Sequence, residues 1–140
     1  MDKMLNISLA RIALKDAGLR LTKQREIILQ ILENNTDHPT ADYIIDALVK
    51  KIGGKIAVAT VYNTLDALTK NGLIQKIEGL ESKKHYDPNT RPHYHAICNE
   101  CKKVYDIFDQ IEFQGLPEKF QISNCLFQGI CKDCQKNKNI

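Results

Sequence analysis

The segment from residue 58 to residue 74, VATVYNTLDALTKNGLI, decides the fold. Its apolar residues recur at helical spacing, which predicts a helix over Ala59–Lys70 with three inward side chains, Val61, Leu65 and Leu68. The pair Asn71-Gly72 is a strong helix stop. Two short strands are expected after it, Leu73–Ile77 and Lys84–Tyr86, around a turn at Gly79. The segment therefore predicts a helix that leads directly into a β-hairpin.

Two helices are predicted near the N-terminus. The first has Ser8 as its N-cap, a stop at Gly18 and an apolar face made of Leu9, Ile12 and Ala13. The second follows Thr22 as its N-cap and ends at Asn34-Asn35. Its apolar residues also share one face: Ile27, Ile28, Ile31 and Leu32.

A third helix is predicted between Thr40, its N-cap, and a break at Gly53-Gly54, with a buried stripe of Tyr43, Ile44, Ala47 and Leu48. Short helices followed by a hairpin are typical of a winged helix-turn-helix, whose last helix enters the major groove of DNA while the hairpin lies along the phosphates. A small helical domain that serves as an interaction module is the alternative on this pattern alone.

Charge and composition favour the same interpretation of the N-terminal part. Residues 1–85 hold 13 Lys and Arg against 10 Asp and Glu, whereas residues 86–140 hold 7 of each kind. The basic excess is weak support for DNA binding by the first part. No apolar run approaches the roughly 20 residues that cross a bilayer, and charges interrupt the first residues where a secretion signal would be apolar. We therefore expect a cytoplasmic protein without a membrane segment.

A proline-rich connector separates two expected domains. Residues 86–92 contain Pro88, Pro92 and several turn formers, which predicts a hinge between a DNA-binding domain at 1–85 and a second domain at 93–140. In the second domain we expect strands over His95–Cys98, Val104–Phe108 and Leu126–Ile130, and a short helix within Ile111–Phe120. The overall prediction is an α+β protein with a small C-terminal α/β domain.

Four of the five cysteines form two C-x-x-C pairs, Cys98 with Cys101 and Cys131 with Cys134, with 29 residues between the pairs. Two such pairs can close a tetrahedral four-sulfur site, which suits structural Zn²⁺. Reactive dithiols, a disulfide switch and an iron–sulfur cluster are the alternatives. Cys125 lies outside both pairs and is expected to be a strand residue.

His93 and His95 need a separate explanation, because four thiolates would leave no position at the zinc ion. Residues i and i+2 of an extended segment share a face, so both imidazoles can point to one centre. Asp87 and Asp106 flank this segment, and His38 stands at a helix start. Imidazoles and carboxylates suit Fe²⁺, Mn²⁺ or Zn²⁺. Two ordinary histidines remain the alternative, and the remaining histidine, His85, is expected to be a solvated strand residue.

Six segments together resemble the ferric uptake regulator family of bacterial metal-dependent repressors. They agree with it in order and spacing over nearly the whole chain: GLRLTKQREIIL (18–29), HPTADYI (38–44), VATVYNTLDALTKNGLI (58–74), HYDPN (85–89), PHYHAICNECKKVYDI (92–107) and GICKDC (129–134). The resemblance implies a transcription regulator rather than an enzyme. A small zinc hydrolase would need an open zinc position, whereas the four-cysteine site is closed.

The resemblance also implies an assembly and its metals. A homodimer would bind an AT-rich inverted repeat in double-stranded DNA through its winged helix, and the C-terminal domain would supply the dimer interface and hold one structural zinc. A regulatory Fe²⁺ or Mn²⁺ between the two domains would be bound by residues that match the family's ligands: His38, Asp87, His93, His95 and Asp106. Binding of this ion would bias one interdomain geometry and so raise DNA affinity.

Asp rather than Glu at position 106 resembles the family's peroxide-sensing PerR branch. This implies that hydrogen peroxide reacts at bound Fe²⁺ in a Fenton-type reaction and oxidises a ligating imidazole, with His38 and His93 matching the oxidised histidines. Metal affinity would then fall and the repressor would leave DNA. An iron-sensing or zinc-sensing uptake repressor is the alternative within the family. The sequence departs from many members before the second knuckle, where it reads FQISNCLFQGIC, and a third metal site that uses Glu112 is therefore doubtful.

The same resemblance implies DNA contacts. Tyr62 would touch base edges or a thymine methyl, with Thr60 and Asn63 nearby. Candidates for phosphate contacts are basic residues in the first domain: Lys15, Arg20, Lys23, Lys55, Lys76, Lys83 and Lys84. A solvated surface charge is the alternative for each of them.

Overall fold

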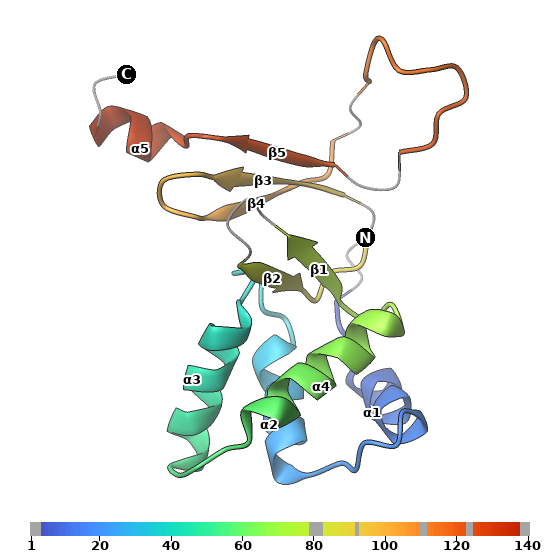
Figure 1. Cartoon of the computed structure of the whole chain (residues 1–140), viewed down its shortest axis with the longest axis vertical. Coiled ribbons are helices and arrows are strands. Elements are labelled where there is room, and N and C mark those ends of the chain that lie inside the picture. Colours follow the sequence, from blue (N-terminus) through green and yellow to red (C-terminus); the bar gives the residue numbers. More distant parts are fainter. Residues whose placement is uncertain (1–3, 79–82, 92, 110–111, 123–124, 138–140) are drawn as a thin grey trace. The chain divides into compact units, whose positions relative to one another are not determined.

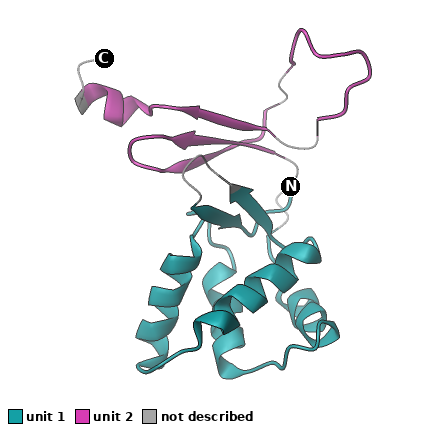
Figure 2. Ribbon diagram, viewed as in Figure 1, with its two compact units in different colours: residues 1–91 teal, residues 92–140 magenta. Residues whose placement is uncertain are grey.

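The computed structural model describes residues 4–78, 83–91, 93–109, 112–122 and 125–137 (Figure 1). The chain divides into two compact units, residues 1–91 and 92–140, which are coloured separately in Figure 2. In the described residues no helix is long and apolar enough to cross a membrane.

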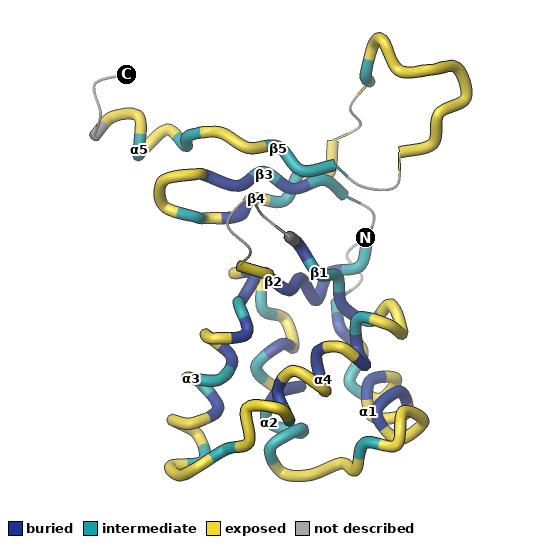
Figure 3. Tube along the Cα trace, in the orientation of Figure 1, coloured by how far each residue is buried: buried dark blue, intermediate teal, exposed yellow. Residues whose placement is uncertain are grey.

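The first unit is four helices followed by a two-stranded antiparallel hairpin. The helices are α1 (Ile7–Asp16), α2 (Lys23–Leu32), α3 (Ala41–Ile52) and α4 (Val58–Lys70), and the strands are β1 (Gln75–Glu78) and β2 (Lys84–Asp87). Ile77 lies opposite His85 in the hairpin. One apolar core joins all four helices, and the tube in Figure 3 shows its buried positions in dark blue along them.

Several local signals act as the sequence predicts. The Thr22 and Thr40 hydroxyl groups accept hydrogen bonds from the backbone N–H groups of Arg25 and Tyr43, so both predicted N-caps are confirmed. Gly53 ends α3 in the left-handed conformation, with φ of 71°, which glycine adopts without steric cost. The inward residues predicted for α4 are confirmed: Val61, Leu65 and Leu68 have no exposed surface. The turn predicted at Gly79 lies outside the described residues.

The predicted face of α1 is wrong for Leu9 and Ile12 and is confirmed only for Ala13. Asn6 rather than Ser8 caps the helix, with its side chain 3.1 Å from the backbone nitrogen of Leu9. The predicted inward residues Leu9 and Ile12 are 52% and 56% exposed, whereas the residues that α1 buries are Ala10, Ala13 and Leu14. Two overlapping apolar stripes fit the sequence of α1, and packing selects the one with small alanines, which allow a close approach.

Tyr43 is also misplaced by the sequence pattern. It was assigned to the buried stripe of α3 but is 53% exposed, while Ile44 and Leu48 are fully buried. The predicted hinge needs a correction at its start as well: Tyr86 and Asp87 belong to β2, and each is 2% exposed. Buried strand residues are held by their neighbours and cannot act as a free connector.

The second unit is built on a three-stranded mixed sheet in the order β4-β3-β5. The strands are β3 (Tyr94–Cys98), β4 (Val104–Ile107) and β5 (Leu126–Gly129), followed by α5 (Lys132–Asn137). All three predicted strands are confirmed. β4 is antiparallel to β3, and β5 is parallel to it. The helix α5 was not predicted.

The helix predicted within Ile111–Phe120 is wrong over its described part. Residues 112–122 contain bends and turns and no helix. Gly115 and Lys119 have positive φ angles of 92° and 61°, and Pro117 between them lacks a backbone donor. A right-handed helix cannot continue through these conformations.

Candidate metal centres and nucleic-acid surface

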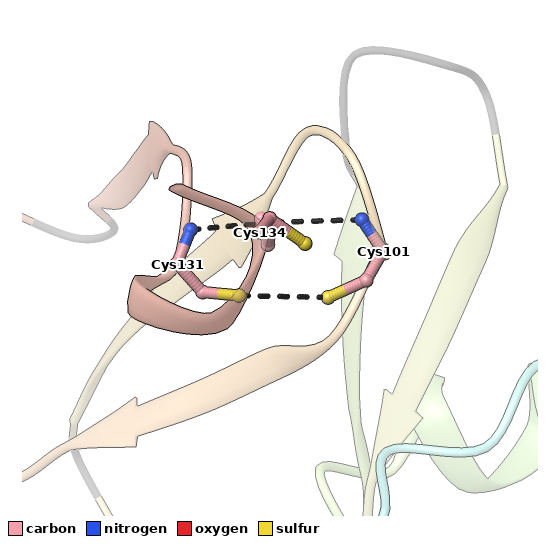
Figure 4. Close-up of side chains that lie close together, drawn as sticks. Cys101, Cys131 and Cys134 are labelled. Carbon is pink, nitrogen blue, oxygen red and sulfur yellow. Dashed lines mark hydrogen bonds between the residues drawn. The ribbon is translucent and has the colours of Figure 1, made fainter. Parts of the chain in front are cut away.

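The four knuckle cysteines meet at one end of the three-stranded sheet. Cys98 ends β3, and Cys101 follows in the turn toward β4. Because β5 runs parallel to β3 with Gly129 opposite Cys98, the chain that leaves β5 delivers Cys131 and Cys134 to the same end. One sulfur from each of the four residues lies within 4.8 Å of the others. In Figure 4 the side chains of Cys101 and Cys131 face one another, and Cys134 comes from α5.

The sulfur spacing fits one tetrahedral ion. The Sγ atoms of Cys101 and Cys131 are 3.8 Å apart. Zn–S bonds of about 2.3 Å at tetrahedral angles place two sulfurs about 3.8 Å apart, whereas a disulfide needs about 2.05 Å. All five cysteines are free thiols. The geometry therefore fits structural zinc and does not fit a formed disulfide.

Backbone donors prepare this cluster for a cation. The N–H groups of Cys131 and Cys101 point at Cys98 Sγ over 3.3 and 3.5 Å, and they lower the pKa of Cys98 to about 6. The pKa of Cys131 is also lowered, chiefly by the backbone N–H of Cys134. A hydrogen bond to Cys131 raises the pKa of Cys134 to about 12, because one proton is held between neighbouring sulfurs. Metal ligands must be thiolates, so the cluster is partly ionised before it binds metal.

Cys125 is not part of this cluster. It lies one residue before β5, and its carbonyl oxygen accepts a hydrogen bond from the backbone N–H of His95 at 3.4 Å. Cys125 thus contributes a backbone hydrogen bond at the start of the pairing between β3 and β5.

In the first unit, His38 and Asp87 form a buried imidazole–carboxylate pair. Nε2 of His38 lies 3.5 Å from Oδ2 of Asp87, and the two side chains are 5% and 2% exposed. Oδ1 of Asp87 accepts the backbone N–H of Asn89 at 2.9 Å, which fixes the carboxylate. His38 has φ of 52°, a left-handed conformation that costs a non-glycine residue about 1–2 kcal/mol.

In the second unit, one carboxylate lies against two imidazoles. Oδ1 of Asp106 is 3.0 Å from Nε2 of His93 and 3.3 Å from Nε2 of His95. The strand pairing places Asp106 directly opposite His95, and the two rings are 4.3 Å apart between centroids. The ring of His93 is also stacked on Phe108, with centroids 4.7 Å apart. The side chains of both histidines are at most 4% exposed, so these are not ordinary solvated residues.

The residues predicted to contact DNA lie in the first unit and are mostly exposed. Tyr62 is 43% exposed on α4, Asn63 is exposed, and Thr60 is half-buried. A recess of about 270 Å³ brings Tyr62 together with Lys83 and Lys84 of the hairpin. Among the other basic candidates, Lys76 is half-buried. The rest are exposed: Lys15, Arg20, Lys23 and Lys55. A surface with a tyrosine among lysines is compatible with a phosphate backbone and base edges.

The sequence did not predict the role of two residues that surround the pair of His38 and Asp87. Asn89 continues the turn that fixes Asp87, and its own side chain accepts the backbone N–H of Arg91 at 3.1 Å. The Asp-Pro-Asn sequence is a turn signal that could have indicated this. His85 is half-buried rather than solvated, and its Nδ1 lies 2.8 Å from the carbonyl oxygen of His38. Its spacing of two from Asp87 on a strand was the available signal.

Comparison with known proteins agrees with this architecture. The model of the ferric uptake regulator family matches residues 16–128, and the chain belongs to this family. Members of the family are transcription regulators. The chain is 37% identical over 133 residues to the peroxide operon regulator of Bacillus subtilis, covering 90% of this chain and 91% of the relative. It is 35% identical over 135 residues to the peroxide-responsive repressor PerR of Staphylococcus epidermidis, covering 91% and 89%.

Solved structures confirm the predicted fold class. The Helicobacter pylori ferric uptake regulator Fur aligns with a TM-score of 0.76 over 96% of this chain and 97% of its own, at 22% identity. The Campylobacter jejuni peroxide stress regulator aligns with a TM-score of 0.53 over 74% and 73%, at 29% identity. The winged helix and the small C-terminal domain with four clustered cysteines are thus those of a metal-dependent repressor family.

Proposed function

We propose that this protein is a cytoplasmic repressor of peroxide-stress genes that binds an AT-rich inverted repeat as a homodimer. Relatives named for the peroxide response align along about nine-tenths of the chain, which supports this function over iron or zinc sensing. The observation that carries the mechanism is the Asp106 carboxylate held between the imidazoles of His93 and His95.

Two metal sites with separate roles follow from the two kinds of ligand. The four clustered thiols hold one structural Zn²⁺, which contributes much of the folding free energy of the small second unit. The regulatory site takes Fe²⁺ or Mn²⁺ on nitrogen and oxygen ligands. It combines His38 and Asp87 of the first unit with His93, His95 and Asp106 of the second.

A site shared by both units explains regulation. Ligands from two units can bind one ion only in a restricted set of arrangements, so metal binding selects among the geometries of the protein. Two half-sites on DNA require a fixed spacing between the winged helices of a dimer. Metal affinity and DNA affinity are therefore linked: the bound metal ion strengthens DNA binding, and bound DNA strengthens metal binding.

Peroxide reverses this linkage by changing a ligand. Bound Fe²⁺ would supply the reductive cleavage of the O–O bond of hydrogen peroxide. The imidazole of His38 or His93 gains one oxygen atom at a ring carbon, and the second peroxide oxygen leaves as water. The oxidised ring binds metal more weakly, so the arrangement that fits DNA is lost. The thiolates held on zinc are poor nucleophiles and do not compete for peroxide.

Peptide mass spectrometry after a brief, low dose of peroxide tests the mechanism. Zinc-loaded protein is treated in parallel with Fe²⁺ and with Mn²⁺, and DNA binding to an inverted-repeat duplex is measured on the same samples. We expect one added oxygen on the peptides that hold His38 or His93 in the iron sample, together with release from DNA. Neither change is expected with Mn²⁺, which does not reduce peroxide in this way.

The other outcomes are distinct. Release from DNA without histidine oxidation would contradict the oxidation mechanism. Iron-dependent DNA binding that peroxide leaves unchanged would indicate an iron-sensing repressor. Zn²⁺-dependent binding at the second site would indicate a zinc-sensing repressor. A protein that binds no inverted repeat with any of these metals would be an interaction module.

A further inference from the structure

His85 holds the backbone of the residue that precedes Pro39. Its Nδ1 lies 2.8 Å from the carbonyl oxygen of His38. A carbonyl oxygen can only accept a hydrogen bond, so Nδ1 of His85 must carry the hydrogen. His85 is therefore a donor aimed at His38 and does not use this nitrogen to bind a metal.

The strand β2 contacts the loop before α3 at successive positions. Asp87, two residues after His85, contacts the imidazole of His38, while His85 contacts the carbonyl group of the same residue. Residues two apart on a strand share a face, so one face of β2 holds both the side chain and the backbone of His38. Between them, the backbone N–H of Tyr86 donates to the carbonyl of Pro39 at 2.9 Å.

His38 requires such support because its backbone conformation is uncommon. Its φ of 52° is unfavourable for a residue with a side chain, and such conformations persist only where the surroundings hold them. The following proline cannot donate a backbone hydrogen bond to help. The side chain of His85 and the backbone of β2 hold this part of the loop from outside it.

We propose that His85 is a positioning residue that presets His38 to bind the regulatory ion, an inference that rests on the proposed function. It acts through His38, to whose carbonyl oxygen its Nδ1 donates. Because His85 directly follows Lys84, it also connects the loop of a metal ligand to the basic end of the hairpin. A change in the position of His38 is thereby passed to the hairpin.

Two substitutions of nearly equal size separate this role from packing. His85→Asn places an amide donor close to the position of Nδ1, and His85→Leu removes the donor. Ile77→Val is the matched control, because Ile77 is the cross-strand neighbour of His85 and the change weakens hairpin packing alone. Asp106→Ala removes a proposed ligand and serves as the reference. The dissociation constant for Mn²⁺, the zinc content and the Tm are measured on zinc-loaded protein.

We expect His85→Leu to weaken Mn²⁺ binding by about tenfold, while His85→Asn and Ile77→Val stay within about threefold of the wild type. Zinc content should be alike in all of these variants, and neither His85 variant should lower the Tm more than the packing control Ile77→Val does. Wild-type Mn²⁺ affinity in His85→Leu beside a loss in Asp106→Ala would overturn the role of His85 and leave the proposed function standing. Unchanged affinity in Asp106→Ala would instead overturn the proposed regulatory site. Equal losses in the Leu and Asn variants, or in Ile77→Val, would show a packing role and also overturn the inference.

Discussion

Asp106 lies directly opposite His95 in the antiparallel pair of β3 and β4, with Oδ1 of the carboxylate 3.3 Å from Nε2 of the imidazole. The strand pairing fixes both backbones, so the length of the acidic side chain decides where its oxygens lie. The carboxylate at this position is therefore a sensitive point for the proposed peroxide chemistry.

Asp106→Glu should uncouple peroxide sensing from repression. The extra methylene keeps a carboxylate but displaces its oxygens from the two histidines, which alters the space available to peroxide. We expect Mn²⁺-dependent DNA binding to survive while histidine oxidation in the iron form falls by up to about a hundredfold, the loss that a misplacement of about 1 Å can cause. Oxidised peptides are counted by mass spectrometry. Asp109→Glu, an exposed change nearby, is the control, and equal oxidation in both variants would contradict the prediction.

Cys98→Ser should release zinc and destabilise the second unit. Cys98 accepts two backbone N–H groups and supplies one of four clustered sulfurs, so its loss opens the site. Structural zinc contributes on the order of 10 kcal/mol to small domains, so unfolding of this unit near room temperature is expected. Metal analysis and circular dichroism measure both effects. Cys125→Ser is the control and should keep a full equivalent of zinc; one equivalent in Cys98→Ser would refute the four-cysteine site.

Zinc affinity should rise with pH through the neutral range. The pKa of Cys134 is raised to about 12, so its thiol is protonated at pH 7 and must lose that proton on binding zinc. The pKa of Cys98 is lowered to about 6, so a second proton is displaced only as pH falls toward and below that value. Calorimetry in buffers of different ionisation enthalpy should show more protons released at pH 5.5 than at pH 7.5. Proton release that does not change between these pH values would contradict the assignment.

Tyr62→Ala should weaken DNA binding without destabilising the fold. Tyr62 is 43% exposed, and one base contact contributes about 1–3 kcal/mol, so affinity for an inverted repeat should fall by roughly 5- to 150-fold. Fluorescence anisotropy of a labelled duplex measures it. Tyr43→Ala, at a 53% exposed tyrosine on α3, is the matched control and should bind normally. Equal affinity in the two variants would remove Tyr62 from the DNA surface.

The sequence predicted the elements of this protein better than the faces they bury. Caps and stops such as Thr22, Thr40 and Gly53 act locally, so the chain alone specifies them. The buried face of α1 depends on what packs against it. Ala10 is therefore buried and Leu9 is exposed, although leucine is the more apolar residue. Periodicity contains no information about which neighbour is close enough to need a small side chain.

The candidate site shows the same division. Spacing alone indicated the two cysteine pairs, because two C-x-x-C motifs constrain each other. The histidines were ambiguous until the register of β3 and β4 placed Asp106 beside them. The contact of His85 was missed because its partner is the backbone carbonyl of His38, 47 residues away. Every residue has a backbone carbonyl, so the sequence does not indicate which one is the partner.

The second unit can be completed only when β5 and the two cysteines that follow it are present. The hairpin of β3 and β4 is local, but β5 joins it only after the intervening residues have been made, and Cys134 comes later still. A chain that stopped before Cys131 would keep α4 and the other helices of the first unit but would lack two of the four clustered cysteines. The second unit of such a fragment would be left incompletely folded, and incompletely folded chains are removed by cellular proteases.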